Sequence, residues 1–269
     1  MRPGDPAGPR RPRRLLLAAI ALILVEGVLT VGRASPAAAA GCPSAAASAI
    51  TAAPAVSART VALTFDDGPG PFLPQILQVL NDNHVPATFF DTGAHDAAFP
   101  ARARQIVADG DLLEDHSWDH RYPAEVPGGW TVPYLQDQVS RTAVQQRALT
   151  GQQVCFFRPP GGFMTIVLAA MRGLGMSPVL WSVDSDDWKQ PAHDSPAAVQ
   201  RITRAATNVG GQSHPIVLLH DAKASYEPDT VVSPYRGNTV QALPGIIAWY
   251  QAHGYQFVEL NGVSSLSGP

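Results

Sequence analysis

The sequence predicts an α/β fold in which parallel strands alternate with helices. Short apolar runs are followed, again and again, by segments with helical periodicity. No repeat, and no linker after residue 58, divides the chain, and 269 residues with 45% hydrophobic content can bury one large core. Repeated strand–helix units bury each strand between helices and favour parallel pairing. Either a barrel or an open doubly wound sheet satisfies this pattern.

The expected elements follow one another in strand–helix order. Strands are expected at residues 60–65, 87–92, 111–114, 154–158, 177–182, 216–220 and 256–260, because each is an apolar run, and helices at residues 73–83, 101–108, 133–149, 166–174, 196–208 and 240–253. These elements form one domain over residues 59–262, followed by a tail at 263–269. No G-x-G-x-x-G motif and no Gly-Lys-Ser/Thr phosphate loop follows the first strand, so a nucleotide site is not indicated.

The first 40 residues have the order of a secretory signal peptide. Residues 1–14 contain five arginines, residues 15–25 are an uninterrupted apolar run, and residues 34–41 are small. Cleavage is expected after Ala40, which ends an A-x-A pattern. The mature protein is therefore expected to be secreted or associated with the cell envelope.

Three other interpretations of this segment stay open. Residues 15–32 are close to the length of an uncleaved membrane anchor, although Glu26 would be costly in lipid. Arg13-Arg14 fits a twin-arginine export signal, and Cys42 follows a sequence that resembles a lipoprotein cleavage box. If the signal is cleaved, no stable membrane partner is expected. Residues 41–58 are Ala/Ser-rich and are expected to be a flexible lead-in.

Charge and cysteine content exclude several classes of function. Removing residues 1–40 takes away six arginines and two acids, which lowers 19 basic and 22 acidic residues to 13 and 20, a net charge near −7. This balance disfavours a nucleic-acid or anionic-membrane binder. Two cysteines are too few for a disulfide scaffold. After export Cys42 and Cys155 could pair, or Cys155 could be a buried thiol, and the sequence does not decide between these.

Reactive side chains cluster where the expected strands end. In parallel barrels the active site lies at the carboxyl ends of the strands, so we expect these side chains to meet at one mouth. Asp66 and Asp67 follow the first strand, His116 and His120 the third, Arg158 closes the fourth, Asp184, Asp187 and Trp188 follow the fifth, and His220 ends the sixth.

Two histidines and a carboxylate suggest a metal site. His116 and His120 are four residues apart, and on one helical turn they would share a face. Alone, such a pair is more often found on a surface or in a core, and Asp66-Asp67 before Gly68 is ordinarily a turn. Together they offer three ligands with open positions for water and substrate, as a catalytic zinc requires. The second carboxylate is then free to accept a proton from the attacking water.

His220 ends a buried apolar strand, where an isolated histidine is usually a satisfied core residue. At the same mouth as a metal it can act as a general acid that protonates a departing amine. Asp187 is placed to hold its tautomer and favour its charged form, whereas Asp184 and Asp186 read as loop caps. Arg158 precedes Pro159-Pro160 and is expected to be held by a rigid loop and to pair with a carboxylate.

Five segments together resemble the polysaccharide deacetylases, the NodB-homology domain of carbohydrate esterase family four. They occur in the family's order and with its approximate spacing, over about residues 60–260. The segments are Thr64–Gly68, His116–His120, Arg158–Gly162, Asp184–Trp188 and Leu218–His220. The resemblance implies a distorted (β/α)7 barrel with parallel strands, as the catalytic domain, and removal of acetyl groups from polysaccharides.

The resemblance also implies roles for four catalytic side chains. Asp66 would be the general base and His220 the general acid. Arg158 would orient Asp66, and Asp187 would tune His220.

A metal and a substrate pocket are implied in the same way. Asp67, His116 and His120 would be the metal ligands, with Zn²⁺ expected and Co²⁺ as the alternative. The backbone N–H of Gly161 would stabilise the oxyanion, and Trp188 and Leu218 would line the pocket for the acetyl methyl group.

The sequence departs from the family pattern in two places. Many members carry an aromatic residue where this chain has Gly161, so a side-chain wall of the substrate groove is expected to be missing. Glu114-Asp115 stands where Gly-Asn is common, which puts the support of His116 in question.

The leading hypothesis is a metal-dependent hydrolase that removes N-acetyl groups from N-acetylglucosamine units of peptidoglycan or chitin. An esterase acting on acetylated xylan and a non-catalytic wall-binding barrel are the alternatives. The sequence is silent on oligomeric state and on the native metal. Substrate contacts are expected from the loops at residues 122–132 and 223–238.

Overall fold

The computed structural model describes residues 42–264, and the expected signal peptide lies outside them. One parallel sheet runs through this part of the chain in the order β5–β4–β3–β2–β1–β7–β6, with β8 beside the start of β1. Its strands are β1 (Thr60–Asp66), β2 (Ala87–Asp91), β3 (Leu112–Asp115), β4 (Phe156–Phe157), β5 (Ser177–Pro178), β6 (Val183–Asp184), β7 (Ile216–His220) and β8 (Gln256–Phe257).

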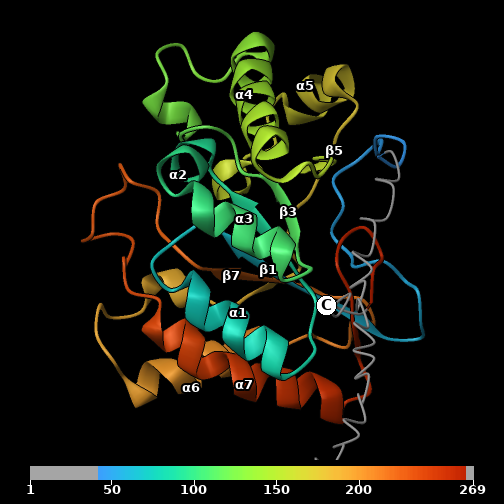
Figure 1. Ribbon diagram of the computed structural model, residues 1–269, viewed down its shortest axis with the longest axis vertical. Helices are drawn as coiled ribbons and strands as arrows, with labels where there is room; N and C mark the ends of the chain where they lie inside the picture. The colour runs from blue at the N-terminus through green and yellow to red at the C-terminus, as the bar shows by residue number, and fades with distance from the viewer. Residues whose placement is uncertain (1–41, 265–269) are drawn as a thin grey trace, which may run out of the picture. The chain divides into compact units, whose positions relative to one another are not determined.

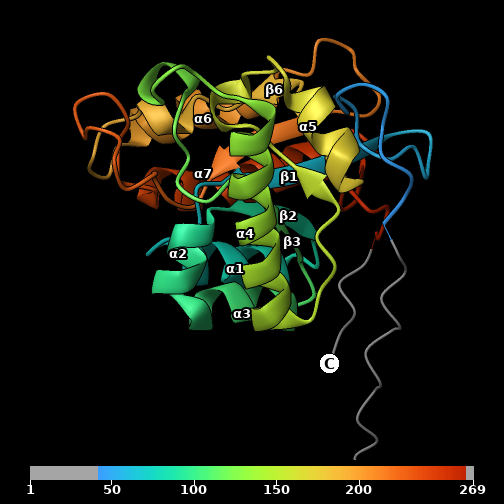
Figure 2. The ribbon, with the colours of Figure 1, turned by 90° about the horizontal axis from the view of Figure 1, so that it is seen from above.

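Helices surround the strands on the outside (Figure 1, Figure 2). Contacts between neighbours run in the order α6–α7–α1–α3–α4–α5, which follows the order of the strands. The helices are α1 (Leu73–Asp82), α2 (Gly93–Ala98), α3 (Pro100–Ala108), α4 (Val132–Thr150), α5 (Val167–Leu174), α6 (Pro196–Ala206) and α7 (Gly237–Ala252), with short 3₁₀ turns η1 (Pro123–Glu125), η2 (Pro160–Gly162) and η3 (Asp187–Lys189). This arrangement confirms the distorted (β/α) barrel.

The central strand β1 is buried along its whole length. Its apolar side chains join a core with Leu77 of α1 and with Ile246 and Tyr250 of α7. A strand that is buried on both faces and rich in apolar residues is stabilised by helices on the outside and by neighbouring strands on both edges. Residue pairing sets the site, because Asp66 at the end of β1 lies beside His220 at the end of β7.

The expected strand at residues 177–182 is wrong in its extent. Only β5 pairs with β4, and a separate short strand, β6, pairs with β7, so the part of the chain that the structure describes contains eight strands instead of seven. The chain changes partners between them: the Leu180 N–H donates to the Ile50 carbonyl, and the Ser182 N–H donates to the Ile216 carbonyl. Helix α2 was also not expected.

Part of the Ala/Ser-rich lead-in is held against the barrel. The Ile50 N–H donates to the Pro178 carbonyl at 2.8 Å, and Ala53 is buried. Cys42 and Cys155 form a disulfide, which answers the question that the sequence left open. Among the helices of residues 42–264, none has the length and hydrophobicity that a bilayer crossing requires.

Candidate metal and catalytic site

Three buried side chains converge where β1 and β3 end. Asp67 Oδ1 lies 3.2 Å from His120 Nε2 and 3.5 Å from His116 Nε2. Within residues 42–264 these three form the one His/Cys/Asp/Glu group compact enough to hold a metal ion. A tetrahedral zinc with bonds of about 2.0–2.2 Å requires donor atoms about 3.3–3.6 Å apart. The observed spacing and the N/N/O donor set therefore fit a divalent cation such as Zn²⁺ or Co²⁺.

The two histidines do not share a helical turn, as the sequence suggested. Residues 116–120 form a loop in which Ser117 and His120 adopt left-handed backbone angles, φ 69° and 59°. Asp67 is also left-handed, with φ 73°. Such angles are unfavourable for side-chain-bearing residues and persist only where the surroundings hold them.

Side chains behind the loop supply that support. The Ser117 N–H donates to Asp115 Oδ1 at 2.7 Å, and the His120 N–H donates to Ser117 Oγ at 3.0 Å. Glu114 accepts the N–H groups of Cys155 and Phe156, both at 2.8 Å, and so anchors the chain that enters β4. The unusual Glu114-Asp115 pair thus supports the site through backbone contacts.

The electrostatics of the ligands favour cation binding. Burial and the nearby His120 hold the pKa of His116 well below its ordinary value, so the ring is neutral. Because Nδ1 lies 2.7 Å from the Arg158 carbonyl oxygen and donates to it, Nε2 is the nitrogen without hydrogen. Burial raises the pKa of Asp67, but the neighbouring His120 and His220 outweigh burial and lower that pKa. A neutral imidazole and an ionised carboxylate are the forms that bind metals.

Asp66 is held by one buried cation. Arg158, whose side chain is fully buried, donates from Nη1 to Asp66 Oδ1 at 2.6 Å and to Thr64 Oγ1 at 2.8 Å. The carbonyl of Arg158 accepts a hydrogen bond from His116 Nδ1 at 2.7 Å. Burial raises the pKa of Asp66 to about 6 even though Arg158 lowers it, so the carboxyl is ionised at neutral pH. Its second oxygen, Oδ2, lies 3.7 Å from His116 Nε2, beside the cluster of Asp67 and the two histidines.

His220 is paired with Asp187 behind it. His220 Nδ1 lies 2.7 Å from Asp187 Oδ1, and Asp187 Oδ2 accepts bonds from the His220 N–H and the Thr239 hydroxyl, both at 2.9 Å. Burial lowers the pKa of His220, but the charge and hydrogen bond of Asp187 outweigh burial and raise it to about 9. The pKa of Asp187 falls to about 2. The pair is therefore an imidazolium and a carboxylate at neutral pH.

One pocket of about 330 Å³ collects these groups. Eight of the ten site residues expected from the sequence line it, and Arg158 and Asp187 lie buried directly behind Asp66 and His220. The eight are Asp66, Asp67, His116, His120, Gly161, Trp188, Leu218 and His220. Six further lining residues were not among them: Tyr122, Phe163, Trp181, Asp184, Glu227 and Val232.

The expected gap in the wall at Gly161 is filled by other aromatic residues. Gly161 has φ 62°, and a Cβ at this position would lie 2.9 Å from Tyr122 Cε1 and 3.0 Å from Phe163 Cε2. The Tyr122 and Phe163 rings, with centroids 5.7 Å apart, thus occupy the space beside the glycine. Tyr122 and Glu227 come from the two loops from which substrate contacts were expected; no local pattern singles out either residue.

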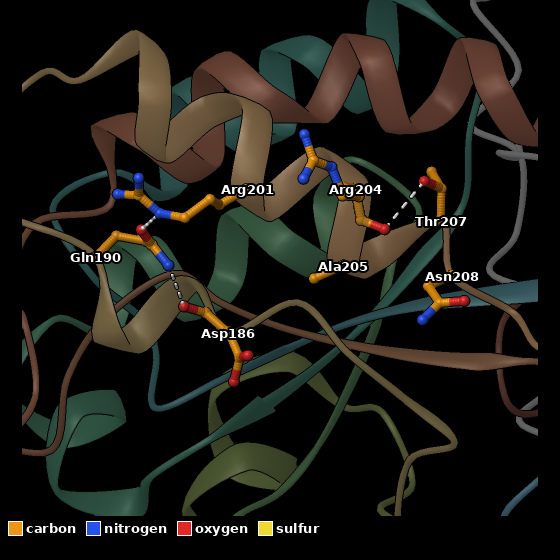
Figure 3. A pocket seen from close by; sticks show the side chains of 7 residues that line it. All are labelled: Asp186, Gln190, Arg201, Arg204, Ala205, Thr207 and Asn208. Atoms are coloured by element: carbon orange, nitrogen blue, oxygen red, sulfur yellow. Dashed lines mark hydrogen bonds between the residues drawn. The ribbon is translucent and has the colours of Figure 1, made fainter.

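A second hollow lies on the outer surface, between α6 and the loop around η3. Figure 3 shows that Arg201 and Gln190 point toward one another, and that the labelled side chains do not converge on a common centre. Arg201 Nε donates to Gln190 Oε1 at 3.0 Å, and Gln190 Nε2 donates to the Asp186 carbonyl at 2.9 Å. Because these polar groups satisfy each other and no metal-ligating group gathers there, the pocket around Asp66 and His220 is the stronger candidate.

Known proteins resemble this chain in sequence and in structure. A family model described as "Polysaccharide deacetylase" matches residues 53–179. A chitooligosaccharide deacetylase from Bradyrhizobium is 35% identical over 74% of this chain and 87% of its own length. A peptidoglycan-N-acetylglucosamine deacetylase from Bacillus cereus is 29% identical over 76% of this chain and 87% of its own.

Solved structures give the same result. A CE4 family pseudoenzyme from Bacillus anthracis superposes with a TM-score of 0.65 at 26% identity, covering 80% of this chain and 68% of the other. Sequence relatives and structural neighbours therefore agree with the motifs at the strand ends. On this evidence the chain belongs to the polysaccharide deacetylase family.

Proposed function

We propose that this chain is a secreted, metal-dependent deacetylase that removes N-acetyl groups from N-acetylglucosamine units of chitin oligomers or peptidoglycan. The observation that carries the proposal is that a carboxylate and an imidazolium, Asp66 and His220, face one pocket beside the Asp67, His116 and His120 cluster. Amide hydrolysis requires a base for the attacking water and an acid for the leaving nitrogen. The named relatives act on polymers of this kind.

Asp66 is proposed as the general base. Arg158 fixes one of its oxygens, and the other faces the metal ligands. Because its pKa is about 6, Asp66 is ionised at neutral pH and still basic enough to accept the proton of an attacking water. Arg158 is proposed to orient it.

His220 is proposed as the general acid. Asp187 accepts the Nδ1–H, which leaves Nε2 as the ring nitrogen available to the pocket. With a pKa of about 9, the ring carries the proton that the departing amine needs, because an amide anion is a very poor leaving group. Asp187 therefore tunes His220 without touching the substrate.

Asp67, His116 and His120 are proposed to hold Zn²⁺, or Co²⁺ as the alternative. When bound, such a cation lowers the pKa of a water molecule and polarises the acetyl carbonyl. The Gly161 N–H is proposed to donate to the carbonyl oxygen as it gains negative charge. Trp188 and Leu218, which line the pocket, would surround the acetyl methyl group.

Secretion is proposed on two grounds. Residues 1–40 have the basic, apolar and small segments of an export signal, and the Cys42–Cys155 disulfide is the kind of crosslink that persists in oxidising compartments. A polymeric cell-wall or chitin substrate outside the cytoplasm is consistent with this location.

Acetate release from chitin oligomers, peptidoglycan and acetylated xylan, with zinc and with cobalt, tests the proposal. Release from the first two with either metal is expected. Preference for acetylated xylan would indicate the esterase alternative, and binding to peptidoglycan without release would indicate a non-catalytic barrel.

Single substitutions separate the roles. Asp66→Ala and His220→Ala should each lower acetate release by about a thousandfold or more while zinc stays bound, because neither residue is a proposed ligand. His120→Ala should instead bind zinc more weakly, through the two remaining donors Asp67 and His116. Retained turnover in Asp66→Ala or His220→Ala, or unchanged zinc binding in His120→Ala, would contradict the assignment.

A further inference from the structure

The loop between β7 and α7, residues 221–236, reaches from the acid side of the pocket to the metal ligand His120. Its base is held by Arg236, a fully buried side chain that donates from Nε to the Ala222 carbonyl at 2.8 Å and from Nη1 to the Ser233 carbonyl at 2.5 Å. The loop thus has a defined path, and its middle part lies against the 116–120 loop.

Two consecutive residues of this loop contact His120. The Tyr226 hydroxyl donates to the His120 carbonyl at 2.8 Å. Glu227 Oε1 lies 3.9 Å from His120 Nδ1, and the same oxygen accepts the Tyr122 hydroxyl at 2.6 Å. Both the backbone and the ring of His120 are therefore approached from one segment that lies more than 100 residues away in sequence.

Two buried atoms in this contact have no hydrogen-bond partner. They are His120 Nδ1 and Glu227 Oε2. The Glu227 side chain is 4% exposed and the His120 side chain 5%, so water does not readily replace the missing partner. His120 Nδ1 thus lies 3.9 Å from a carboxylate that still has one unpaired oxygen, just beyond hydrogen-bond distance. Buried polar atoms are normally paired, so this arrangement indicates a hydrogen bond that one more event completes.

Metal binding is the event that would complete this hydrogen bond, because it determines which nitrogen of the His120 ring carries the hydrogen. His120 Nε2 points to Asp67, so a cation there fixes the tautomer with hydrogen on Nδ1. The other histidine ligand already has its partner, because His116 Nδ1 lies 2.7 Å from the Arg158 carbonyl oxygen. His120 has only Glu227: of the carboxylates in the described chain, it is the one within 4.0 Å of His120 Nδ1.

We propose that Glu227 is a positioning residue for His120, an inference that rests on the metal site proposed above. The Glu227 carboxylate accepts the His120 Nδ1–H when His120 Nε2 binds the metal. Its charge makes the imidazole a stronger ligand, and its hydrogen bond fixes the orientation of a ring whose backbone is left-handed. The Tyr122 hydroxyl holds the carboxylate in place, and Tyr226 holds the backbone.

Zinc affinity of the full chain, measured by competition with a chromophoric chelator, tests this without using activity. Glu227→Ala should weaken zinc binding by about ten- to a hundredfold, as loss of such a partner does elsewhere. Glu227→Gln, which keeps an acceptor oxygen and loses the charge, should weaken binding less. Asp229→Asn is the matched control: it removes the same charge from the same loop at a side chain 71% exposed, and should leave the affinity unchanged.

A second measurement separates a direct effect on His120 from a general charge effect. In a His120→Ala background, Glu227→Gln should have no further effect on zinc affinity, because the residue through which Glu227 acts is gone. An equal loss in both backgrounds would overturn the proposal, as would zinc affinities within twofold of the wild type in both Glu227 variants. Failure of the wild-type chain to bind zinc at all would instead count against the proposed function.

Discussion

Asp187→Asn tests how the proposed acid is tuned. The substitution keeps the size of the side chain and removes the negative charge that lies 2.7 Å from His220 Nδ1. Without that charge, burial is the largest remaining influence and favours the neutral ring. The pKa of His220 should therefore fall from about 9 to its ordinary value of 6.5 or below.

The size of the effect follows from this difference. At pH 8 an imidazole with a pKa of about 9 is about 90% protonated, and one with a pKa of 6.5 is about 3% protonated. Catalysis that requires the imidazolium should then fall by about 30-fold or more at pH 8. The difference in pKa corresponds to about 3 kcal/mol of favourable interaction with the charged ring.

The assay is kcat for acetate release from a chitin oligomer as a function of pH. The wild type should lose activity as the pH rises through about 9, and Asp187→Asn should lose it near or below pH 6.5. Thr239→Val, which removes one hydrogen bond to Asp187 and no charge, is the control and should keep the wild-type alkaline limb. An Asp187→Asn enzyme whose alkaline limb stays at pH 9 would refute the reasoning.

Four further outcomes are expected. Gly161→Ala should lower the free energy of unfolding in urea by about 1–2 kcal/mol, because alanine is disfavoured at φ 62° and its Cβ would meet Tyr122; unchanged stability would show that the loop relaxes. Cys42→Ser should cost about 2–4 kcal/mol by the same measurement, with no further loss on adding Cys155→Ser, since the bridge spans 113 residues. EDTA should abolish acetate release, and zinc or cobalt should restore it; activity that survives chelation would exclude the metal proposal. The pKa of His220 is raised from 6.5 to about 9 in the folded state, so its ion pair with Asp187 should stabilise the fold fully below pH 6.5. This stabilisation should be lost as the pH rises through 9. The difference in Tm between the wild type and Asp187→Asn should therefore shrink between pH 7 and pH 10.

The order of strands and helices could be predicted because it depends on local periodicity. The buried strands β1 and β7 are rich in apolar residues, and their ends carry Asp66 and His220. Parallel pairing alone then brings these residues to one edge. The prediction was wrong at residues 177–182, where the chain changes sheet partners. The pattern of apolar residues does not show which neighbouring strand a segment bonds to, so this change could not be predicted from it.

The support around the proposed metal ligands could not be predicted in the same way. The left-handed backbone of His120 depends on Ser117 and on Tyr226, which is far away in sequence. Glu227 lies in an irregular loop, where neither a two-residue nor a 3.6-residue period marks which side chain turns inward. Helix α2 is short and begins at Gly93, a residue that typically weakens a predicted helix; here a Cβ would lie 2.5 Å from Trp118.

Arg158 holds both the proposed base and one proposed metal ligand, through different atoms. Its guanidinium holds Asp66, and its carbonyl oxygen holds the ring of His116. A substitution of Arg158 that also reorients its loop would therefore affect two functions at once, proton transfer by Asp66 and metal binding by His116. A replacement that removes only the guanidinium and keeps the backbone path would disturb Asp66 alone.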